Sequence, residues 1–379
     1  MNNKSIMKIY RFCAVALVTA LAVASCGSAA KKAGKALDKE TEMYKSFVLD
    51  LCKRAELPSM QVCYTVPGKT ISFAVTNEDF YSEPAHAKYR LREIDNLTQY
   101  EACSISKVPL GYLACRTADK GLFDLDKPLY EYCPEILDRF VESDREKAKQ
   151  LTGRICLTHT CGLDNKSYKK TPDSPGISFK YPIGEYHYSG PGIFLVQLAL
   201  EKIWGETLDV YSARELFKPL GMNHTNYLWQ PYNEELSPYG FRRNGKVQRN
   251  KSWGGLKCNA AYSMRTTAEE FTIFLKYIMD GGELSKDMYA QMLHKYVVSE
   301  KKNTYRGLAW RLVEDPELGL IVYHTGNNGS FRGNALCIPS RYETLVFFYN
   351  GQPKPKVAIN DEMTRAFFKN KEPIAAFVP

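Results

Sequence analysis

The sequence lacks the short motifs that mark metal sites and disulfide scaffolds. It holds no HExxH and no CxxC pair, although it has 11 cysteines. One cysteine falls in the N-terminal apolar run and one directly after it, which leaves an odd number: Cys52, Cys63, Cys103, Cys115, Cys133, Cys156, Cys161, Cys258 and Cys337. This spacing argues against a zinc ribbon and a disulfide framework, although one or two disulfides remain open. We expect no metal or other cofactor.

A concentrated basic patch is also missing. The formal net charge is +9, but acidic residues lie between most of the basic ones. Only short basic clusters occur, KSYKK at 166–170 and RRNGKVQRNK at 242–251. Dispersed surface charge of this kind favours no nucleic-acid partner.

Long hydrophobic runs are absent except near the N-terminus. Lys4, Lys8 and Arg11 precede CAVALVTALAVA at 13–24, which is short for a membrane span and typical of a secretory signal. The run ends at VASC, small residues followed by Cys26, which resembles the lipobox of bacterial lipoproteins. That resemblance implies a signal peptide over 1–25 and a lipid on Cys26. A plain secretory signal with a chance cysteine is the alternative.

After cleavage the chain would begin with a flexible tether over 26–40 and a net charge nearer +6. The expected location is the bacterial cell envelope, anchored to a membrane by the N-terminal lipid and facing the periplasm or the cell surface. One domain would follow over 41–372.

Periodicity in that domain places strands at both ends and helices in the middle. KETEMYKSFVLDLCKRAEL at 39–57 has helical apolar spacing, and two β-rich runs at 60–66 and 70–76 flank a Pro-Gly-Lys turn. Residues 78–97 are polar and irregular. Helices are predicted at 192–205 and 266–282, the second with a capping box at its start.

Four β-rich runs follow from residue 306, and 357–370 reads as a final helix. The predicted fold class is α+β. An antiparallel sheet, built from about 41–97 and 306–372, would be flanked by helices, with a mostly helical region inserted over about 98–305.

The stretch YEACSISK at 100–107 carries the first candidate chemistry. Ser104 and Lys107 stand three apart, so on the first turn of a helix they share one face, and a partly desolvated lysine can take the serine proton. Ser-x-x-Lys occurs five times in the chain. Only the match at Ser104 follows a strand-like run and precedes an apolar helix.

Three later stretches give this pair a context. They are ICLTHTCGLD at 155–164, YHYSGPGIF and its continuation through PLGMNHTNY at 186–227, and YHTGNNGSFRG at 323–333. In this order, from about residue 55 to about 352, they resemble the serine β-lactamase and penicillin-binding-protein superfamily. The resemblance is to its class C β-lactamase-like serine hydrolases and esterases, which implies a β-lactamase/transpeptidase-like fold.

The resemblance also implies roles for particular residues. Ser104 would be the acyl-accepting nucleophile, with Lys107 as its partner and Tyr188 as the second proton carrier. His324, Thr325 and Gly326 match the Lys-Thr-Gly element, on an edge strand that faces the serine. The backbone N–H groups of Ser104 and of Asn327 would form the oxyanion hole.

Two residues depart from the family pattern. Gly190 stands where Tyr-x-Asn has asparagine, and His324 stands where Lys-Thr-Gly has lysine. A cationic His324 holding a substrate carboxylate would make affinity fall as pH rises through about 6.5. The plainer alternatives are that Tyr188 is a core tyrosine, that His324 caps a strand end and that His159 is a buried structural histidine.

The expected function is an exported serine hydrolase that forms an acyl-enzyme with an ester or amide. The two departures favour a carboxylesterase or D-amino-acid peptidase over an efficient β-lactamase. The alternative is a lipoprotein that binds or senses cell-wall peptides or β-lactams without turnover. The expected partner is a small-molecule or peptide substrate.

Overall fold

The computed structural model describes residues 37–165, 176–249, 258–299 and 303–369. The predicted signal peptide, the lipidation candidate Cys26 and most of the predicted tether lie outside these residues. Residues 37–40 belong to a helix over 37–55, so the predicted tether over 26–40 is wrong for these four residues.

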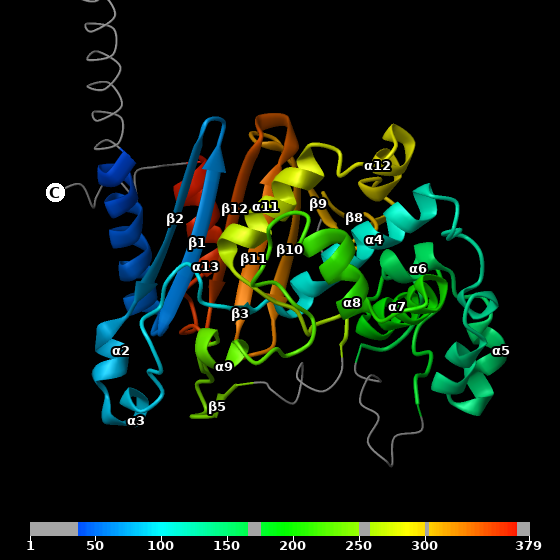
Figure 1. The fold of residues 1–379 in the computed structure, drawn as a ribbon, viewed down its shortest axis with the longest axis horizontal. Coiled ribbons are helices and arrows are strands. Elements are labelled where there is room, and N and C mark those ends of the chain that lie inside the picture. Colours follow the sequence, from blue (N-terminus) through cyan, green and yellow to red (C-terminus); the bar gives the residue numbers. More distant parts are fainter. Residues whose placement is uncertain (1–36, 166–175, 250–257, 300–302, 370–379) are drawn as a thin grey trace, which may run out of the picture.

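An antiparallel sheet of eight strands forms one half of the molecule, in the order β2-β1-β12-β11-β10-β9-β8-β7 (Figure 1). The bounds of its strands are β2 Lys69–Thr76, β1 Ser59–Val66, β12 Glu343–Tyr349, β11 Arg332–Ile338, β10 Gly319–Asn327, β9 Arg311–Asp315, β8 Thr304–Arg306 and β7 Val297–Val298. Both ends of the chain contribute, since β1 pairs with β12. The predicted α+β class and the predicted hairpin are confirmed.

Successive side chains of the central strands point alternately into two hydrophobic cores, one on each face of the sheet. On β12, Leu345 and Phe347 belong to one core, whereas Val346 and Phe348 belong to the other. Successive side chains of a strand point to opposite faces, so a fully apolar run such as ETLVFFY requires a covered sheet on both sides.

Helices cover both faces of this sheet. The helix over 37–55 and the C-terminal helix α13 (Ile359–Thr364), extended by a π-helical turn at Arg365–Lys369, pack on one face. Helix α11 (Ala268–Met279) packs on the other, against β1, β11 and β12 (Figure 1). Thr267 caps α11 by accepting the N–H of Glu270 at 3.1 Å, as the capping-box pattern predicts.

The segment over 78–97 is less irregular than predicted, because it contains the short helices α2 (Glu78–Ser82) and α3 (Pro84–Ala87). Helices this short show no apolar periodicity. In the described part of the inserted region, the α-helices besides α11 are α4 Lys107–Asp119, α5 Arg145–Ala148, α6 Gly153–Leu157, α7 Gly190–Trp204, α8 Leu208–Ser212, α9 Asn233–Leu236 and α12 Lys286–Met292. Its short turns are the 3-10 segments Cys103–Ser106, Leu129–Glu131, Pro134–Arg139 and Glu142–Asp144 and the π segment Ala213–Phe217, and a further 3-10 turn, Pro339–Arg341, lies between β11 and β12.

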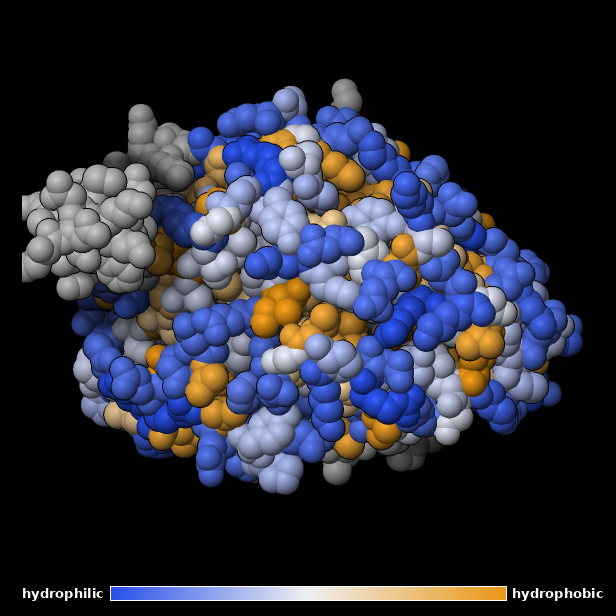
Figure 2. Space-filling model, turned by 45° about the horizontal axis from the view of Figure 1, so that its top comes forward, coloured by the Kyte–Doolittle hydropathy of each residue, from blue (hydrophilic) through white to orange (hydrophobic). Residues whose placement is uncertain are grey.

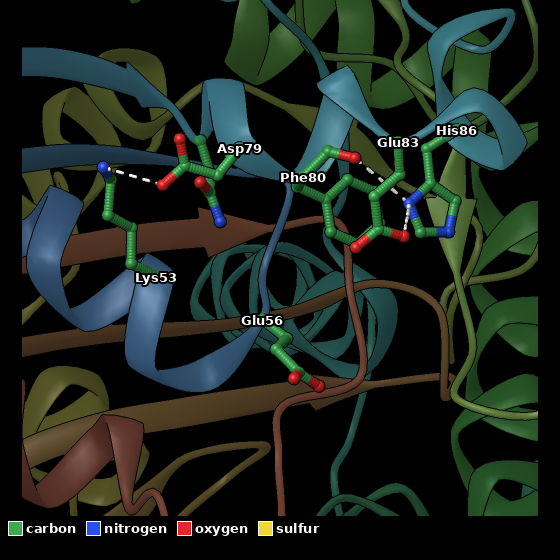
Figure 3. A pocket seen from close by; sticks show the side chains of 7 residues that line it. Lys53, Glu56, Asp79, Phe80, Glu83 and His86 are labelled. Carbon is green, nitrogen blue, oxygen red and sulfur yellow. Dashed lines mark hydrogen bonds and ion pairs between the residues drawn. The ribbon is translucent and has the colours of Figure 1, made fainter.

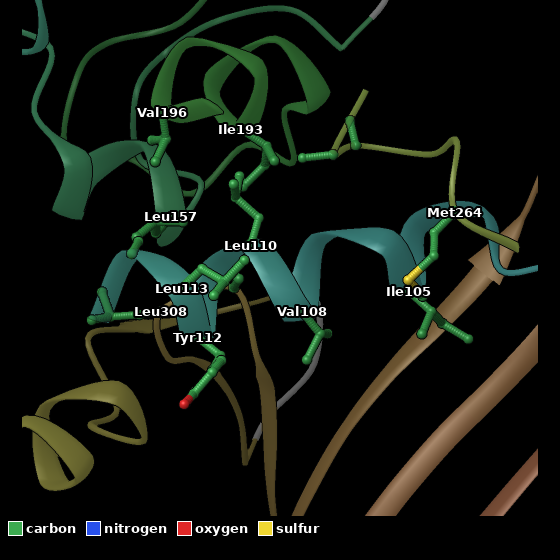
Figure 4. Packing of buried hydrophobic residues seen from close by; sticks show 14 of the residues in the cluster. Ile105, Val108, Leu110, Tyr112, Leu113, Leu157, Ile193, Val196, Met264 and Leu308 are labelled. Carbon is green, nitrogen blue, oxygen red and sulfur yellow. The ribbon is translucent and has the colours of Figure 1, made fainter. Parts of the chain in front are cut away.

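Two small strand pairs also lie among the described residues: β3 Tyr100–Glu101 with β6 Arg265–Thr266, and β4 Gly240–Phe241 with β5 Val247–Gln248. Helix α4 packs against neighbouring helices through its apolar side chains (Figure 4). Its side chains Leu110 and Leu113 are fully buried among residues of α6 and α7, such as Leu157 and Ile193. This burial fixes α4, which begins at Lys107 directly after the turn that carries Ser104, against the rest of the molecule.

The surface in Figure 2 is mainly hydrophilic, with small apolar areas between charged side chains. Large exposed apolar side chains such as Leu91, Leu122 and Val210 come from separate segments of the chain. None of the helices in the described part of the chain has the length and apolar character needed to cross a membrane. The nine cysteines of the described ranges are free thiols, and eight of them are buried.

Candidate active site

Ser104 lies in the 3-10 turn Cys103–Ser106, which continues directly into α4. The residue before it, Cys103, has a φ of +52°, in the left-handed region that costs a non-glycine residue roughly 1 kcal/mol or more. This turn redirects the chain between β3 and α4. Ser104 stays partly exposed there, whereas Cys103 and Lys107 are buried.

Lys107 is held against Ser104 by its own helix and by one distant backbone group. Its Nζ lies 3.2 Å from Ser104 Oγ and donates to the carbonyl of Ala261 at 2.6 Å. The i, i+3 spacing brings the two side chains together, and the Ala261 carbonyl fixes the direction of the amine. Local spacing does not predict this contact, because the two residues are 154 positions apart in the chain.

The charge of Lys107 is destabilised where it lies. The residue is 2% exposed, and burial lowers the pKa of its amine below the ordinary lysine value. Tyr188 opposes this shift, and the Arg306 guanidinium adds to it. A lysine in this position is more readily neutral, as a base for the Ser104 proton must be.

Tyr188 completes a compact group with Lys107. The Lys107 ammonium lies 5.0 Å from the centre of the Tyr188 ring. Tyr188 precedes Ser189, the N-cap of α7, whose Oγ accepts the N–H of Gly192 at 3.2 Å. The tyrosine therefore stands at the positive end of a helix of 15 residues.

His159 contacts both Tyr188 and Ser189. It is fully buried, its ring centre lies 4.4 Å from that of Tyr188, and its Nδ1 accepts the N–H of Ser189 at 3.2 Å. Burial holds the pKa of His159 well below 6.5. The structural interpretation of His159 is thus supported, with the added feature that it packs directly on Tyr188.

The Tyr188 hydroxyl is buried and has no hydrogen-bond partner among the described residues. Burial alone would raise the pKa of this phenol. The Lys107 charge, the proximity of Lys107 and Ser104 as potential hydrogen-bond partners and the Arg306 charge outweigh it, so the pKa of Tyr188 falls below the ordinary value.

Strand β10 brings the segment His324, Thr325, Gly326 and Asn327 to the turn that carries Ser104. A Cβ at Gly326 would lie 2.3 Å from the Ala102 carbonyl oxygen, so only glycine allows this approach. The prediction of an edge strand is wrong for β10 as a whole, because it pairs with β9 on one side and β11 on the other. The pairing with β9 stops at Tyr323, however, so 324–327 extends beyond β9.

His324 is buried, at 1% exposure, and its ring centre lies 6.4 Å from that of Tyr188. Its Nδ1 donates to the Thr325 carbonyl at 2.8 Å, which leaves Nε2 as a lone-pair acceptor in the neutral ring. Burial first, and then the charges of Arg311, Lys107 and Arg306, hold its pKa well below 6.5. A loss of charge on His324 as pH rises through about 6.5, on which the expected pH dependence of affinity rests, disagrees with this lowered pKa.

The two other predicted binding residues lie at the borders of this group. Gly190 is the first residue of α7, and its N–H donates to Asn165 Oδ1 at 2.8 Å. The family pattern has an asparagine at position 190, and here another asparagine, Asn165, contacts the glycine at that position. Asn327 is exposed, and its Oδ1 accepts the N–H of Gly329 at 2.8 Å. Arg306, which sequence reasoning missed, donates to the Tyr186 hydroxyl and lies 5.4 Å from the Tyr188 ring centre.

A separate hollow of about 270 Å³ lies between the end of the helix over 37–55 and α2–α3 (Figure 3). It is lined by Lys53, Glu56, Asn77, Asp79, Phe80, Glu83 and His86, and none of these belongs to the Ser104 group. Lys53 pairs with Asp79 at 2.9 Å, and His86 stacks on Phe80 (Figure 3). The chemistry described above lies elsewhere.

The model of the β-lactamase family matches residues 45–368, which is most of the chain. The chain belongs to the β-lactamase family. Members of this family are serine hydrolases with the fold seen here.

Curated relatives of this family member are distant. An N-acetylmuramyl-L-alanine amidase of Bacillus subtilis is 26% identical over 49% of the chain and 46% of its own length. A putative D-alanyl-D-alanine carboxypeptidase of Escherichia coli is 23% identical over 55% of the chain and 54% of its own length. The chain thus spans about half the length of these relatives.

Solved structures show the same fold. A D-alanine carboxypeptidase from Burkholderia cenocepacia superposes with a TM-score of 0.68 at 18% identity, covering 85% of this chain and 97% of the other. A β-lactamase/D-alanine carboxypeptidase from Pseudomonas syringae gives 0.70 at 16% identity, covering 87% and 98%. At these identities the likeness concerns the fold alone.

Proposed function

We propose that this β-lactamase-family protein acts through an acyl-enzyme on Ser104. The observation that carries the proposal is the 3.2 Å contact between Ser104 Oγ and the buried amine of Lys107. In its neutral form the amine takes the serine proton as Oγ attacks a carbonyl carbon. The backbone N–H groups of Ser104 and Asn327 receive the developing oxyanion.

The proton then has to reach the leaving group. Tyr188, whose pKa is lowered beside Lys107, passes it to the departing oxygen or nitrogen, and the C–O or C–N bond of the substrate breaks. Water enters on the same side, loses its proton to the Lys107–Tyr188 pair and attacks the ester carbonyl. Ser104 Oγ regains a proton as the acid product leaves.

The substrate is an ester or an amide, of the carboxylesterase or D-amino-acid peptidase type, rather than a β-lactam hydrolysed efficiently. A neutral, buried His324 offers no cation to a substrate carboxylate, and Gly190 offers no side-chain amide. Relatives named as a carboxypeptidase and an amidase support this choice. The N-terminal sequence supports export and a lipid anchor on Cys26, with the domain held at the cell envelope.

A substrate screen tests the proposal. Short acyl esters, D-Ala-D-Ala peptides and nitrocefin are offered to the purified protein, with Ser104→Ala as the blank. We expect turnover of esters or peptides by the wild type only. Equal signals from the wild type and Ser104→Ala across the whole panel contradict it.

A second candidate function is binding or sensing of cell-wall peptides without turnover. The replacement of asparagine by Gly190 and of lysine by His324 motivates it, because these positions lack groups that assist catalysis in related enzymes. Stable acylation of Ser104 by a labelled penicillin, with no release over hours, favours the sensor. Release with a return of free enzyme favours the hydrolase.

A further inference from the structure

Glu101, three residues before Ser104, is a buried carboxylate with no role in the chemistry above. It is 7% exposed. Its Oε1 accepts from Arg265 Nη2 at 3.2 Å, and its Oε2 accepts from Asn328 Nδ2 at 2.5 Å. Asn328 directly follows Asn327, so one carboxylate joins the serine-bearing turn to the end of β10.

The Asn328 side chain is oriented for this contact by its own turn. Its Oδ1 accepts the N–H groups of Ser330 at 3.1 Å and Phe331 at 2.8 Å. Its backbone N–H donates to the Phe331 carbonyl at 3.1 Å. The amide oxygen is therefore occupied inside the turn, and the amide nitrogen points to Glu101.

Glu101 is equally fixed on its other side. It pairs with Arg265 across β3 and β6, and the next residue, Ala102, donates its N–H to Met264 at 2.9 Å. Arg265 is 2% exposed, and its guanidinium lies 4.4 Å from the centre of the Trp229 ring. The carboxylate therefore has a partner on β6 and a partner in the turn that follows β10.

We propose that Glu101 is a positioning residue that sets the place of the Asn327 N–H relative to Ser104. This inference rests on the proposed function. The segment 324–327 extends beyond β9 and is paired only with β11, so contacts with the serine turn hold its other side. The Glu101–Asn328 bond and the close approach at Gly326 are two of those contacts.

The expected effect follows from the sensitivity of oxyanion stabilisation to geometry. A misplacement of about 1 Å can reduce a rate about 100-fold, and loss of one oxyanion donor costs about 100- to 1,000-fold. In Glu101→Gln the amide nitrogen would face the Asn328 nitrogen, so two donors meet, or the Arg265 contact is lost. We expect acylation by a chromogenic ester or a fluorophosphonate to slow about 10- to 100-fold.

The kinetic signature separates positioning from a general loss of fold. The Asn327 N–H acts mainly on the transition state, so kcat and kcat/KM should fall together while KM stays near the wild-type value. Rates are expressed per active site, counted by complete labelling. Glu270→Gln is the matched control, since Glu270 is also 7% exposed and also bonds through both oxygens, to His224 and Thr225. It should lower the melting temperature and leave the acylation rate per site unchanged.

A reciprocal exchange supplies the rescue. Asn328→Asp alone places two carboxylates side by side and should also slow acylation. Glu101→Gln combined with Asn328→Asp restores a donor–acceptor pair at the same place and should recover about tenfold or more of the loss, since each restored hydrogen bond to a charged group contributes about that factor.

Wild-type acylation per site in Glu101→Gln overturns the proposal, as does a double variant that is as slow as Asn328→Asp. Ser104→Ala separates this failure from failure of the proposed function. If Ser104→Ala labels like the wild type, the acyl-enzyme itself is refuted, whatever Glu101 does.

Discussion

One added methyl group at Gly326 would perturb the junction between β10 and the serine turn directly. A Cβ there would lie 2.3 Å from the Ala102 carbonyl oxygen, where ordinary contacts with a carbon atom are about 3.5 Å. Strand and turn must therefore separate by about 1 Å in Gly326→Ala. Because the obstacle is backbone, no side-chain rotation relieves it.

Two effects of different size are expected. Overpacking in a buried region costs about 1–3 kcal/mol of unfolding free energy. A shift of about 1 Å between Ser104 and Asn327 should reduce the acylation rate constant about 100-fold. Urea unfolding measures the first effect, and labelling by a fluorophosphonate, counted per active site, measures the second.

Gly153→Ala serves as the control for this variant. Its Cβ would lie 2.6 Å from the Phe123 ring, in the helical part and away from the serine turn. It should lose stability on the same scale and keep the wild-type rate per site. If Gly326→Ala acylates as fast as Gly153→Ala, the approach of β10 to Ser104 does not position the oxyanion hole, and the reasoning fails.

Three further predictions concern charge and strain around the site. Arg306→Gln should shift the rising limb of the pH–rate profile to higher pH, because Arg306 lowers the pKa values of Lys107 and Tyr188, whereas Arg306→Lys should leave the limb nearer its place; equal profiles would contradict this. When the pH is lowered from 7.5 to 5.5, the free energy of unfolding of the wild type should fall by about 1.4 kcal/mol more than that of His324→Gln. The reason is that the unfolded His324 takes up a proton below about 6.5 while the folded one stays neutral; parallel losses in urea unfolding would count against a neutral ring. Cys103→Gly should equal Cys103→Ala in unfolding free energy or exceed it by up to about 1 kcal/mol, because alanine keeps a Cβ at a φ of +52°. A more stable alanine variant would show that no strain is stored there.

Features that depend on local spacing followed from the sequence. The Ser104–Lys107 pair rests on the i, i+3 geometry of one helical turn, and the Thr267 cap rests on four consecutive residues. The sheet was predicted from strand-rich runs at both ends of the chain. Each of these patterns contains its own structural reason within a short stretch.

Features that depend on distant segments did not follow. The Ala261 carbonyl that directs Lys107 lies 154 residues away along the chain. The burial of His324 depends on what packs against β10, and the side-chain type alone left the charge of the ring open. The reason for a glycine at position 326 became visible only with the Ala102 carbonyl beside it.

Peptide mapping of fluorophosphonate-labelled protein tests the central claim most directly. The protein is labelled, digested and sequenced by mass spectrometry, with Lys107→Ala and Ser104→Ala in parallel. We predict a single adduct on Ser104 in the wild type, a strongly slowed adduct in Lys107→Ala and none in Ser104→Ala. An adduct on another serine, or equal labelling of all three proteins, would contradict the assignment of Ser104 as the nucleophile.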